Sequence, residues 1–302
     1  MENPEGTVVI YSYWMNIGAR AMCLLDDFRG IRIARAHRID LYEEVTDRKY
    51  LPLLRRISLT MDAIFFISEH GKDYFEGRTG LPSSKNIVSR LGVSNPFPFN
   101  PVKSGSAVFR IVSCSGLIKV KRVHLIIQAL EKLRTDKKII WNHFGEGNLK
   151  DELYRMAEER LGRKENTEFR FMGQVPNSEL MEFYNSNDIG LFINTSASEG
   201  IPVSIMEAQS FGIPAIATDT GGAREIIREN TGIILPHDFS IADLTNWIEY
   251  YVNMEPEETA EIRRIIYASW DHNFNAALNY GEFIKKVNRI LAPGKNDPKQ
   301  LA

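Results

Sequence analysis

The feature that most constrains this chain is an alternation, kept over nearly its whole length, of short apolar runs with longer amphipathic segments. Uninterrupted apolar runs rich in β-branched and aromatic residues are typical of strands buried on both faces of a sheet. Strands that alternate with helices build βαβ units, in which the sheet is parallel and helices cover its faces. The sequence therefore predicts an α/β fold built on parallel sheets.

The alternation falls into two blocks. In residues 1–91 it predicts a partial domain, with strands at Val8–Tyr11, Ile31–Ala36, Ala63–Ile67 and Ile87–Ser89, and helices near Ala19–Phe28, Leu51–Met61 and Glu69–Phe75. In residues 107–272 it predicts a complete doubly wound domain, with strands at Phe109–Cys114, Ile139–Phe144, Glu168–Met172, Ile189–Ile193 and Ala215–Ala217. We therefore expect two domains.

The two blocks are separated by residues 92–106, which contain three prolines with scattered Gly, Ser and Asn. These residues interrupt backbone hydrogen bonding, so the segment is predicted to be an interdomain linker. Helical patterns dominate from Ile241 to Leu291, and the last helix is expected at residues 273–291. Residues 292–302 are polar and predict a flexible tail.

Composition excludes several classes of protein. The chain has 37 Lys and Arg against 39 Asp and Glu, so it lacks the positive surplus typical of nucleic-acid binding, and no nucleic-acid partner is expected. Its two cysteines, Cys23 and Cys114, lie far apart, which predicts reduced thiols. No uncharged stretch reaches the ~18 residues of a membrane span, and the first residues lack a basic secretory start. These features predict a cytoplasmic protein.

The most specific chemical pattern lies in residues 194–225. Glu199 follows a predicted strand after a short loop rich in Ser and Thr, and parallel sheets bind ligands beyond the carboxyl ends of their strands. Pro202 suits the first turn of a helix, where unpaired backbone N–H groups attract phosphate. Gly200 before it, and the pair Gly221–Gly222 after the next strand, allow a ligand close to the backbone.

Glu199 and Glu207 lie one in this loop and one in the helix that follows. A carboxylate can accept hydrogen bonds from two neighbouring sugar hydroxyls, and beside a ring carbon it can stabilise oxocarbenium-like charge. A sugar nucleotide offers both partners. The alternative for Glu207 is an ordinary acid that the helix dipole favours in an early turn.

The ten residues from Glu199 read Glu-Gly-Ile-Pro-Val-Ser-Ile-Met-Glu-Ala and resemble the E-x7-E element of retaining glycosyltransferases of family 4. The likeness continues through Gly212-Ile-Pro-Ala-Ile-Ala-Thr, Gly221-Gly-Ala-Arg-Glu, Phe171-Met-Gly-Gln-Val and His143-Phe-Gly-Glu-Gly. In the front block, Arg35-Ala-His-Arg-Ile-Asp is similar to a branch that builds extracellular and capsular polysaccharides, including amylovoran-type enzymes. The resemblance implies the GT-B architecture, with two Rossmann-like domains around a cleft and a last helix that crosses back to the first domain.

The resemblance also implies a role for each matching residue. Glu199 would lie beside the donor sugar, and Glu207 would bind the nucleotide ribose. Lys121 would neutralise the departing nucleoside diphosphate; its alternative is a solvated lysine at a helix start. The residues implied to hold the sugar hydroxyls, the diphosphate and the base are Gly200, Ile201, Pro202, Val203, Gly145, Gln174 and Val175. For Gln174 and Val175 a plain turn at a strand end is the alternative.

The chain departs from the family's pattern at position 116. The family's usual phosphate-binding arginine, five residues before Lys121, falls on Gly116. Arg122 or Lys119 could supply the missing charge, although neither occupies the same position. Gly116 and Arg122 are both assigned to the donor site. The glycine at position 116 is expected to affect donor affinity and activity.

His37 and Asp40 follow the second predicted strand, again at a carboxyl end. The resemblance implies that His37 contacts a donor hydroxyl or phosphate and takes part in catalysis, whereas a lone histidine is otherwise most often structural. Arg38 stands where the family usually has glycine. The chain has no Asp-x-Asp motif, and its six histidines lack ligand spacing. Neither a metal ion nor another cofactor is therefore expected.

Two functions remain open. The first is a retaining glycosyltransferase that moves a hexose from a nucleoside diphosphate sugar to a glycan or polyprenol-linked acceptor in polysaccharide biosynthesis. The second is a catalytically silent sugar-nucleotide-binding module that needs a partner, because the resemblance begins inside the family's front domain, whose first strands and glycine-rich acceptor loop are expected to be absent. An NAD-dependent oxidoreductase is excluded, since no strand is followed by Gly-x-Gly-x-x-Gly.

The stretch from Arg29 to Arg56 carries eight positive charges against four negative ones. This excess favours peripheral contact with anionic lipid at the inner membrane face, which would suit a polyprenol-linked acceptor. The alternative is an ordinary solvated surface whose charges are partly balanced by their neighbours.

Overall fold

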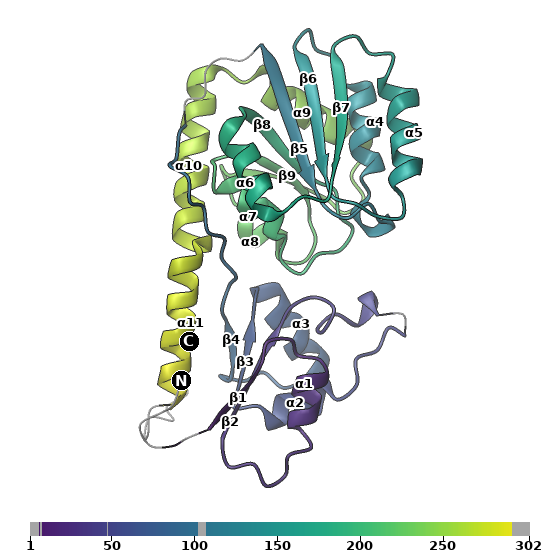
Figure 1. Ribbon diagram of the computed structural model, residues 1–302. Helices are drawn as coiled ribbons and strands as arrows, with labels where there is room; N and C mark the ends of the chain where they lie inside the picture. Colours follow the sequence, from purple (N-terminus) through teal and green to yellow (C-terminus); the bar gives the residue numbers. More distant parts are fainter. Residues whose placement is uncertain (1–5, 7, 47, 102–106, 292–302) are drawn as a thin grey trace. The chain divides into compact units, whose positions relative to one another are not determined.

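The computed structural model describes residues 6, 8–46, 48–101 and 107–291. The chain forms two compact units (Figure 1): Met1–Gly92 together with Ala276–Ala302, and Val93–Asn275. Each unit contains one parallel sheet with helices on its faces. The expected α/β class with two parallel-sheet units is confirmed. Among the described helices, none combines the length and apolar character needed to span a bilayer.

The sheet of the first unit has four strands in sequential order, β1-β2-β3-β4. Its elements are β1 (Val9–Ser12), α1 (Ile17–Met22), β2 (Ile31–Ala36), the short 3-10 helix η1 (Glu43–Val45), α2 (Leu54–Thr60), β3 (Ala63–Phe66), α3 (Glu69–Thr79), β4 (Asn86–Val88) and α11 (Ala276–Leu291). The last helix belongs here because Phe283, Val287 and Ile290 pack against the sheet residues Ile33, Ala63, Phe65 and Ile87. Helix α11 thus covers apolar strand residues that would otherwise face water.

Two helices of the first unit are shorter than the sequence pattern predicts. The expected helix Ala19–Phe28 ends at Met22, since Asp26 and Asp27 would place negative charge at the carboxyl end of a longer helix, where the dipole opposes it. The expected helix Leu51–Met61 begins only at Leu54. Leu53 before it has a left-handed backbone, with φ 67°, and Pro52 disfavours helical geometry in the residue that precedes it.

The sheet of the second unit has six parallel strands in the order β10-β9-β8-β5-β6-β7. The strands are β5 (Val108–Cys114), β6 (Lys138–Phe144), β7 (Thr167–Gly173), β8 (Ile189–Asn194), β9 (Ala215–Thr218) and β10 (Gly232–Leu235). The helices are η2 (Lys119–Lys121), α4 (His124–Lys132), α5 (Lys150–Leu161), α6 (Asn177–Ser186), α7 (Val203–Gln209), α8 (Ala223–Ile226), α9 (Ile241–Asn253) and α10 (Pro256–Phe274). Strand β10 was not predicted.

The two faces of this second sheet are covered by different helices. Helices α4, α5 and α9 pack on one face, where they enclose Trp141 of β6 (Figure 1). On the other face Phe144 at the end of β6 contacts Phe183 of α6, with ring centroids 5.0 Å apart. The chain therefore turns to one face after β5 and to the opposite face after β8, which is the arrangement of a doubly wound sheet.

Candidate active site

The strand order of the second unit reverses between β5 and β8. The chain proceeds from β5 outward to β7, returns to β8 on the other side of β5, and continues outward to β10. Ligands of open parallel sheets bind beyond the carboxyl ends of the strands at such a reversal, because the two loops there diverge to opposite faces. The candidate site is therefore built from the loops that follow β5 and β8.

At this reversal the structure joins two of the predicted site residues. Lys121 lies in η2 after β5, and Glu199 lies in the loop after β8. The Lys121 ammonium Nζ lies 2.5 Å from Glu199 Oε1, and the amide of Asn194 donates to the same oxygen at 3.4 Å. The side chains of Lys121 and Glu199 are 19% and 11% exposed. The pair is thus largely shielded, yet open enough for a ligand to reach it.

The two loops are also bonded to each other, through the Thr195 side chain and through one backbone hydrogen bond. The hydroxyl of Thr195 donates to the carbonyls of Lys121 and Arg122, at 3.0 and 3.1 Å. The backbone N–H of Ala197 donates to the carbonyl of Val120 at 2.7 Å. These bonds fix the separation of the loops, and the loops hold the Lys121–Glu199 pair in place.

Arg122 is turned away from this pair. Its guanidinium donates to the Thr195 carbonyl at 2.7 Å, to the His237 carbonyl at 2.9 Å and to the Thr218 hydroxyl at 3.1 Å. Its backbone is left-handed, with φ 49°, and burial lowers its pKa. The Arg122 side chain is therefore hydrogen-bonded to protein oxygens and joins the carboxyl ends of β8, β9 and β10.

Glu207 lies in α7 and contacts the first residue of α6. Its Oε1 accepts a hydrogen bond from Asn177 Nδ2 at 2.7 Å. Burial raises the pKa of Glu207 above its ordinary 4.5, and the Asn177 hydrogen bond opposes that rise. Burial, together with the charge of Glu207, raises the pKa of the Cys114 thiol to about 12. Cys114 is therefore a protonated neighbour of this carboxylate at neutral pH.

Residues 200–203 lead from the loop into α7. Gly200 is buried and its carbonyl accepts from the Gly222 N–H at 2.7 Å. Pro202 is the residue just before the helix, one position earlier than expected, and Val203 is its first residue. Ile201 and Pro202 are buried, whereas Val203 is exposed. A Cβ at Gly221 would collide with the Glu199 carbonyl, so glycine is required where the two loops meet.

The remaining predicted donor-site residues line the same edge. Gly116 follows β5, and the nearest atom to a Cβ built on it would be the Glu146 carbonyl at 3.6 Å. Gly145 follows β6 and donates its N–H to the Gly173 carbonyl at 2.8 Å. Gln174 and Val175 come directly after β7, two to three residues before the Asn177 that contacts Glu207.

Several residues of this edge were not assigned from sequence. Asn177 and Asn194 hold the two glutamates, and Ser113 and His143 form a buried pair below the loop after β5. His143 belongs to a segment that resembles the family, but a buried histidine carries no sequence signal of its partners. Asn177 begins a predictable helix, although nothing in its neighbourhood indicates that it reaches Glu207.

His37 belongs to the first unit, at the end of β2. Its ring is 6% exposed and lies against the rings of Tyr13 and Trp14, at centroid distances of 4.7 and 4.2 Å. The Asp40 carboxylate accepts from the backbone N–H groups of Met15 and His37, at 2.7 and 2.9 Å. Neither ring nitrogen has a hydrogen-bond partner among the described residues, although Nδ1 lies 3.7 Å from Asp40 Oδ2. Asp40 thus fixes the loops after β1 and β2, while the His37 ring remains available.

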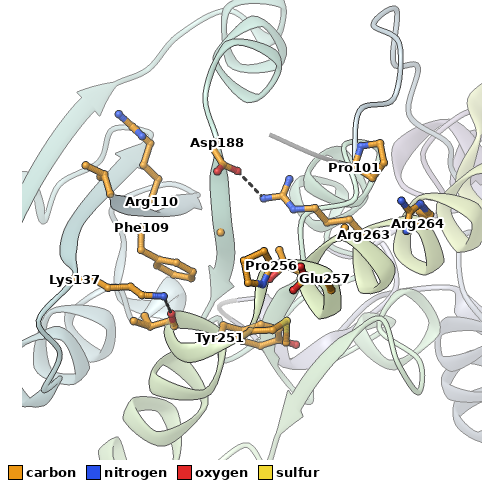
Figure 2. A pocket seen from close by; sticks show the side chains of 16 residues that line it. Pro101, Phe109, Arg110, Lys137, Asp188, Tyr251, Pro256, Glu257, Arg263 and Arg264 are labelled. Carbon is orange, nitrogen blue, oxygen red and sulfur yellow. Dashed lines mark hydrogen bonds and ion pairs between the residues drawn. The ribbon is translucent and has the colours of Figure 1, made fainter. Parts of the chain in front are cut away.

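A cavity of about 530 Å³ also exists in the second unit, at the opposite end of the strands. Figure 2 shows that Phe109 and Asp188, which lie at the amino ends of β5 and β8, face it, and that Asp188 contacts Arg263 of α10. Lys137 also lines it, and its ammonium donates to the Val252 carbonyl at 2.6 Å. This cavity is separate from the candidate site. Within the described part of the chain, no three His, Cys, Asp or Glu side chains are grouped as metal ligands.

Comparison with known proteins places these features in a family. The putative colanic acid biosynthesis glycosyltransferase WcaL of Escherichia coli is 26% identical over 85% of this chain and 62% of its own length. The amylovoran biosynthesis glycosyltransferase AmsK of Erwinia amylovora is 29% identical over 50% of this chain and 38% of its own length. The chain thus spans about three fifths of the length of WcaL.

A solved structure shares the fold. Anabaena HepE in complex with UDP superposes with a TM-score of 0.74 at 19% identity, over 94% of this chain and 79% of HepE. The family model described as glycosyl transferases group 1 matches residues 100–268, which is more than half of the chain and includes the whole edge around Lys121, Glu199 and Glu207. The chain belongs to the glycosyl transferases group 1 family.

Proposed function

We propose that this chain acts as a glycosyltransferase that moves a hexose from a nucleoside diphosphate sugar to a glycan or polyprenol-linked acceptor in polysaccharide biosynthesis. The observation that carries the proposal is the Lys121–Glu199 pair, held at 2.5 Å at the strand-order reversal. A cation and a carboxylate side by side match the two ends of a sugar nucleotide's reacting bond, namely the anionic diphosphate and the sugar carbon.

The Lys121 ammonium can serve both partners at once, because it has three N–H donors and Glu199 uses one of them. When the bond between the sugar and the diphosphate breaks, negative charge grows on the diphosphate and positive charge grows on the sugar ring. Lys121 stabilises the first charge, and Glu199 stabilises the second. We propose retention of the anomeric configuration and no metal ion, since this pair provides the charge compensation that such a transfer needs.

Glu207 is proposed to bind the ribose. Two neighbouring ribose hydroxyls can donate to one carboxylate, and the Asn177 amide that holds Glu207 leaves its second oxygen for them. Gln174 and Val175, just before α6, are proposed to lie along the base. The UDP bound to HepE supports a nucleoside diphosphate as the ligand class.

In the first unit, His37 is proposed to bind a ligand hydroxyl or phosphate through a ring nitrogen that is free among the described residues, and the surface formed by α1 and α2 is proposed to contact the acceptor's membrane. The exposed leucines Leu24 and Leu25 follow α1, and Leu59 lies on α2, which packs against α1. Arg55 and Arg56 lie on α2 together with Leu59. Apolar side chains beside basic ones favour the surface of an anionic bilayer, which supports a peripheral location on the cytoplasmic face of the membrane.

The proposal is tested by calorimetric titration of the whole chain with a panel of nucleoside diphosphates and their sugars, followed by a transfer and hydrolysis assay. Glu207→Gln is expected to weaken binding of the preferred nucleotide by about tenfold or more, because the ribose loses a charged acceptor. Glu199→Ala is expected to lower turnover by about 100-fold while binding is largely kept.

The matched control is Glu158→Ala on the exposed face of α5, which should change neither quantity. Equal turnover for Glu199→Ala and Glu158→Ala would contradict the catalytic assignment. Nucleotide binding with no transfer and no hydrolysis would instead support a silent sugar-nucleotide-binding module.

A further inference from the structure

A chain of buried hydrogen bonds lies directly below the loop that follows β5. Ser113 of β5 and His143 of β6 are neighbours in the parallel ladder. Trp141 Nε1 donates to Ser113 Oγ at 2.9 Å, Ser113 Oγ contacts His143 Nδ1 at 2.8 Å, and His143 Nε2 lies 3.1 Å from the Ser115 carbonyl. The side chains of Trp141 and His143 are fully buried, and Ser113 is 2% exposed.

The direction of every proton in this chain follows from its two ends. An indole N–H can only donate, so Ser113 Oγ accepts from Trp141. A carbonyl oxygen can only accept, so the contact between His143 Nε2 and the Ser115 carbonyl requires the proton on Nε2. The neutral ring is then unprotonated at Nδ1, which accepts the Ser113 hydroxyl proton. Burial lowers the pKa of His143 to about 4, so the ring is neutral at physiological pH.

The hydrogen bond from His143 fixes the orientation of the Ser115–Gly116 peptide. In a trans peptide the C=O and the following N–H point in opposite directions. Because the Ser115 carbonyl points to the buried imidazole, the Gly116 N–H points away from it, toward the open carboxyl edge of the sheet. Among the described residues the Gly116 N–H has no hydrogen-bond acceptor.

The neighbouring loop supports the same orientation. A Cβ at Gly145 would collide with the Ser115 carbonyl, and Gly145 has φ +131°, which side chains rarely adopt. The backbone of the loop after β6 therefore lies directly against this peptide. The Ser115 and Leu117 N–H groups donate to the carbonyls of Phe144 and Glu146, both at 2.9 Å. Gly116 is the one amide between them that faces outward.

We propose that His143 is a positioning residue of the donor site: it holds the Ser115 carbonyl inward and so presents the Gly116 N–H to a phosphate oxygen of the nucleoside diphosphate. The identity of the ligand in this inference rests on the proposed function. The hydrogen bond between His143 and the Ser115 carbonyl is independent of that function. A backbone N–H that is already oriented binds an anion without a further cost of ordering the loop.

The inward hydrogen bond is tested first, without ligand. Nitrogen-15 spectra of the full chain labelled at its histidines, with His143 assigned through His143→Gln, should show a neutral ring protonated at Nε2 at pH 6. Ser113→Ala removes the hydroxyl that faces Nδ1, whereas the Ser115 carbonyl still requires a proton on Nε2, so the same tautomer is expected in this variant. A wild-type ring protonated at Nδ1, or at both nitrogens, would overturn the proposal.

The effect on the donor site is tested by titrating UDP into wild type, His143→Gln and His143→Asn. The glutamine amide can reach the place of Nε2 and donate to Ser115, so its affinity should remain within about twofold of wild type. The asparagine amide is one methylene shorter, and about tenfold weaker binding is expected, as for the loss of one hydrogen bond. In wild type the Gly116 amide proton resonance should shift downfield when UDP binds.

Thr245→Val provides the matched control. Thr245 is also buried on the α4–α9 side and donates to the Ala129 and Ile241 carbonyls, so its loss lowers stability without touching the loop after β5. Its UDP affinity should equal that of wild type. Wild-type affinity in His143→Asn, or equal losses in the Asn and Gln variants, would overturn the positioning role. A wild-type chain that binds no nucleoside diphosphate would contradict the proposed function, and the phosphate role of Gly116 with it.

Discussion

The two units are built from the same βαβ element but differ in how their strands are ordered. In the first unit the order β1-β2-β3-β4 never reverses, whereas in the second it reverses between β5 and β8. Crossovers between parallel strands are right-handed, so a sheet that grows in one direction places its helices on one face. Only the reversal separates two neighbouring loops to opposite faces and creates a crevice.

The polar side chains at the two carboxyl edges differ in the same way. In the second unit Lys121, Glu199, Arg122 and Glu207 all have charged or hydrogen-bonding protein partners. In the first unit the buried His37 ring has none for its Nε2 among the described residues. The comparison teaches that the side chains of the second unit's edge are held by protein partners before any ligand binds. In the first unit the buried His37 ring nitrogen lacks such a partner within the described part of the chain, and a ligand that bonds to it would remove that energetic cost.

The largest expected effect distinguishes the roles of two neighbouring residues of the second unit, Lys121 and Arg122. Lys121→Ala should lower kcat by about 100- to 1,000-fold, because the departing diphosphate loses its cation; it also lowers stability, because the shielded Glu199 carboxylate loses its ion-pair partner. Arg122→Ala should destabilise the second unit by about 2–3 kcal/mol, because three protein oxygens lose a charged donor, while the kcat of the folded variant falls far less than in Lys121→Ala.

Steady-state kinetics and urea unfolding measure the two quantities. The exposed Trp14 reports on the first unit and the buried Trp141 on the second, so the transition of the first unit should remain unchanged in both variants. An equal loss of kcat in folded Lys121→Ala and Arg122→Ala would remove the distinction between a ligand-binding cation and a structural one.

A second prediction concerns the pH dependence of stability that arises from the buried His143. The folded pKa of His143, about 4, lies below its ordinary 6.5, so the unfolded chain takes up a proton first as the pH falls. The stability that depends on the neutral ring is therefore complete above pH 6.5 and is lost toward pH 4, by about 3 kcal/mol. Urea unfolding of the second unit at several pH values should show this loss in wild type and a correspondingly smaller one in His143→Gln.

His37→Gln serves as the control in the first unit. It removes a histidine of similar burial that lies outside the second unit, so the acid dependence of the second unit should stay as in wild type. The same reduction of acid dependence in both variants would mean that the measured transition belongs to the chain as a whole and that the two edges are not energetically separate.

The smallest expected effect concerns the glycines after β5 and β6. Gly116→Arg should bind UDP about tenfold more tightly, because a guanidinium forms charge-assisted bonds to phosphate and the added Cβ meets nothing closer than 3.6 Å. Gly145→Ala should weaken binding, since its Cβ would displace the Ser115 carbonyl. Calorimetry with UDP measures both, and Gly116→Gln controls for added bulk without charge.

Much of the second unit could be predicted from sequence. Five of its six strands were predicted, and the exception is Gly232–Leu235, which begins with a glycine. The ends of helices were harder to predict in the first unit, where Pro52 and the left-handed Leu53 precede α2 and the helix begins only at Leu54. Local chain geometry at one or two residues decides such boundaries, and apolar periodicity does not report it.

The sequence by itself determined that Lys121 and Glu199 follow strands and that Glu207 lies in the helix after Glu199, because a motif and its spacing are local properties. Only the tertiary structure decided which of these side chains contact each other. Lys121 and Glu199 are 78 residues apart and meet because the strand order reverses between β5 and β8. In the same way, Arg122 is hydrogen-bonded to the carboxyl ends of three strands, and His143 is hydrogen-bonded to Ser113 on the neighbouring strand. Partners of this kind depend on which strands lie side by side, and that arrangement comes from the packing of the whole sheet rather than from the residues near either partner.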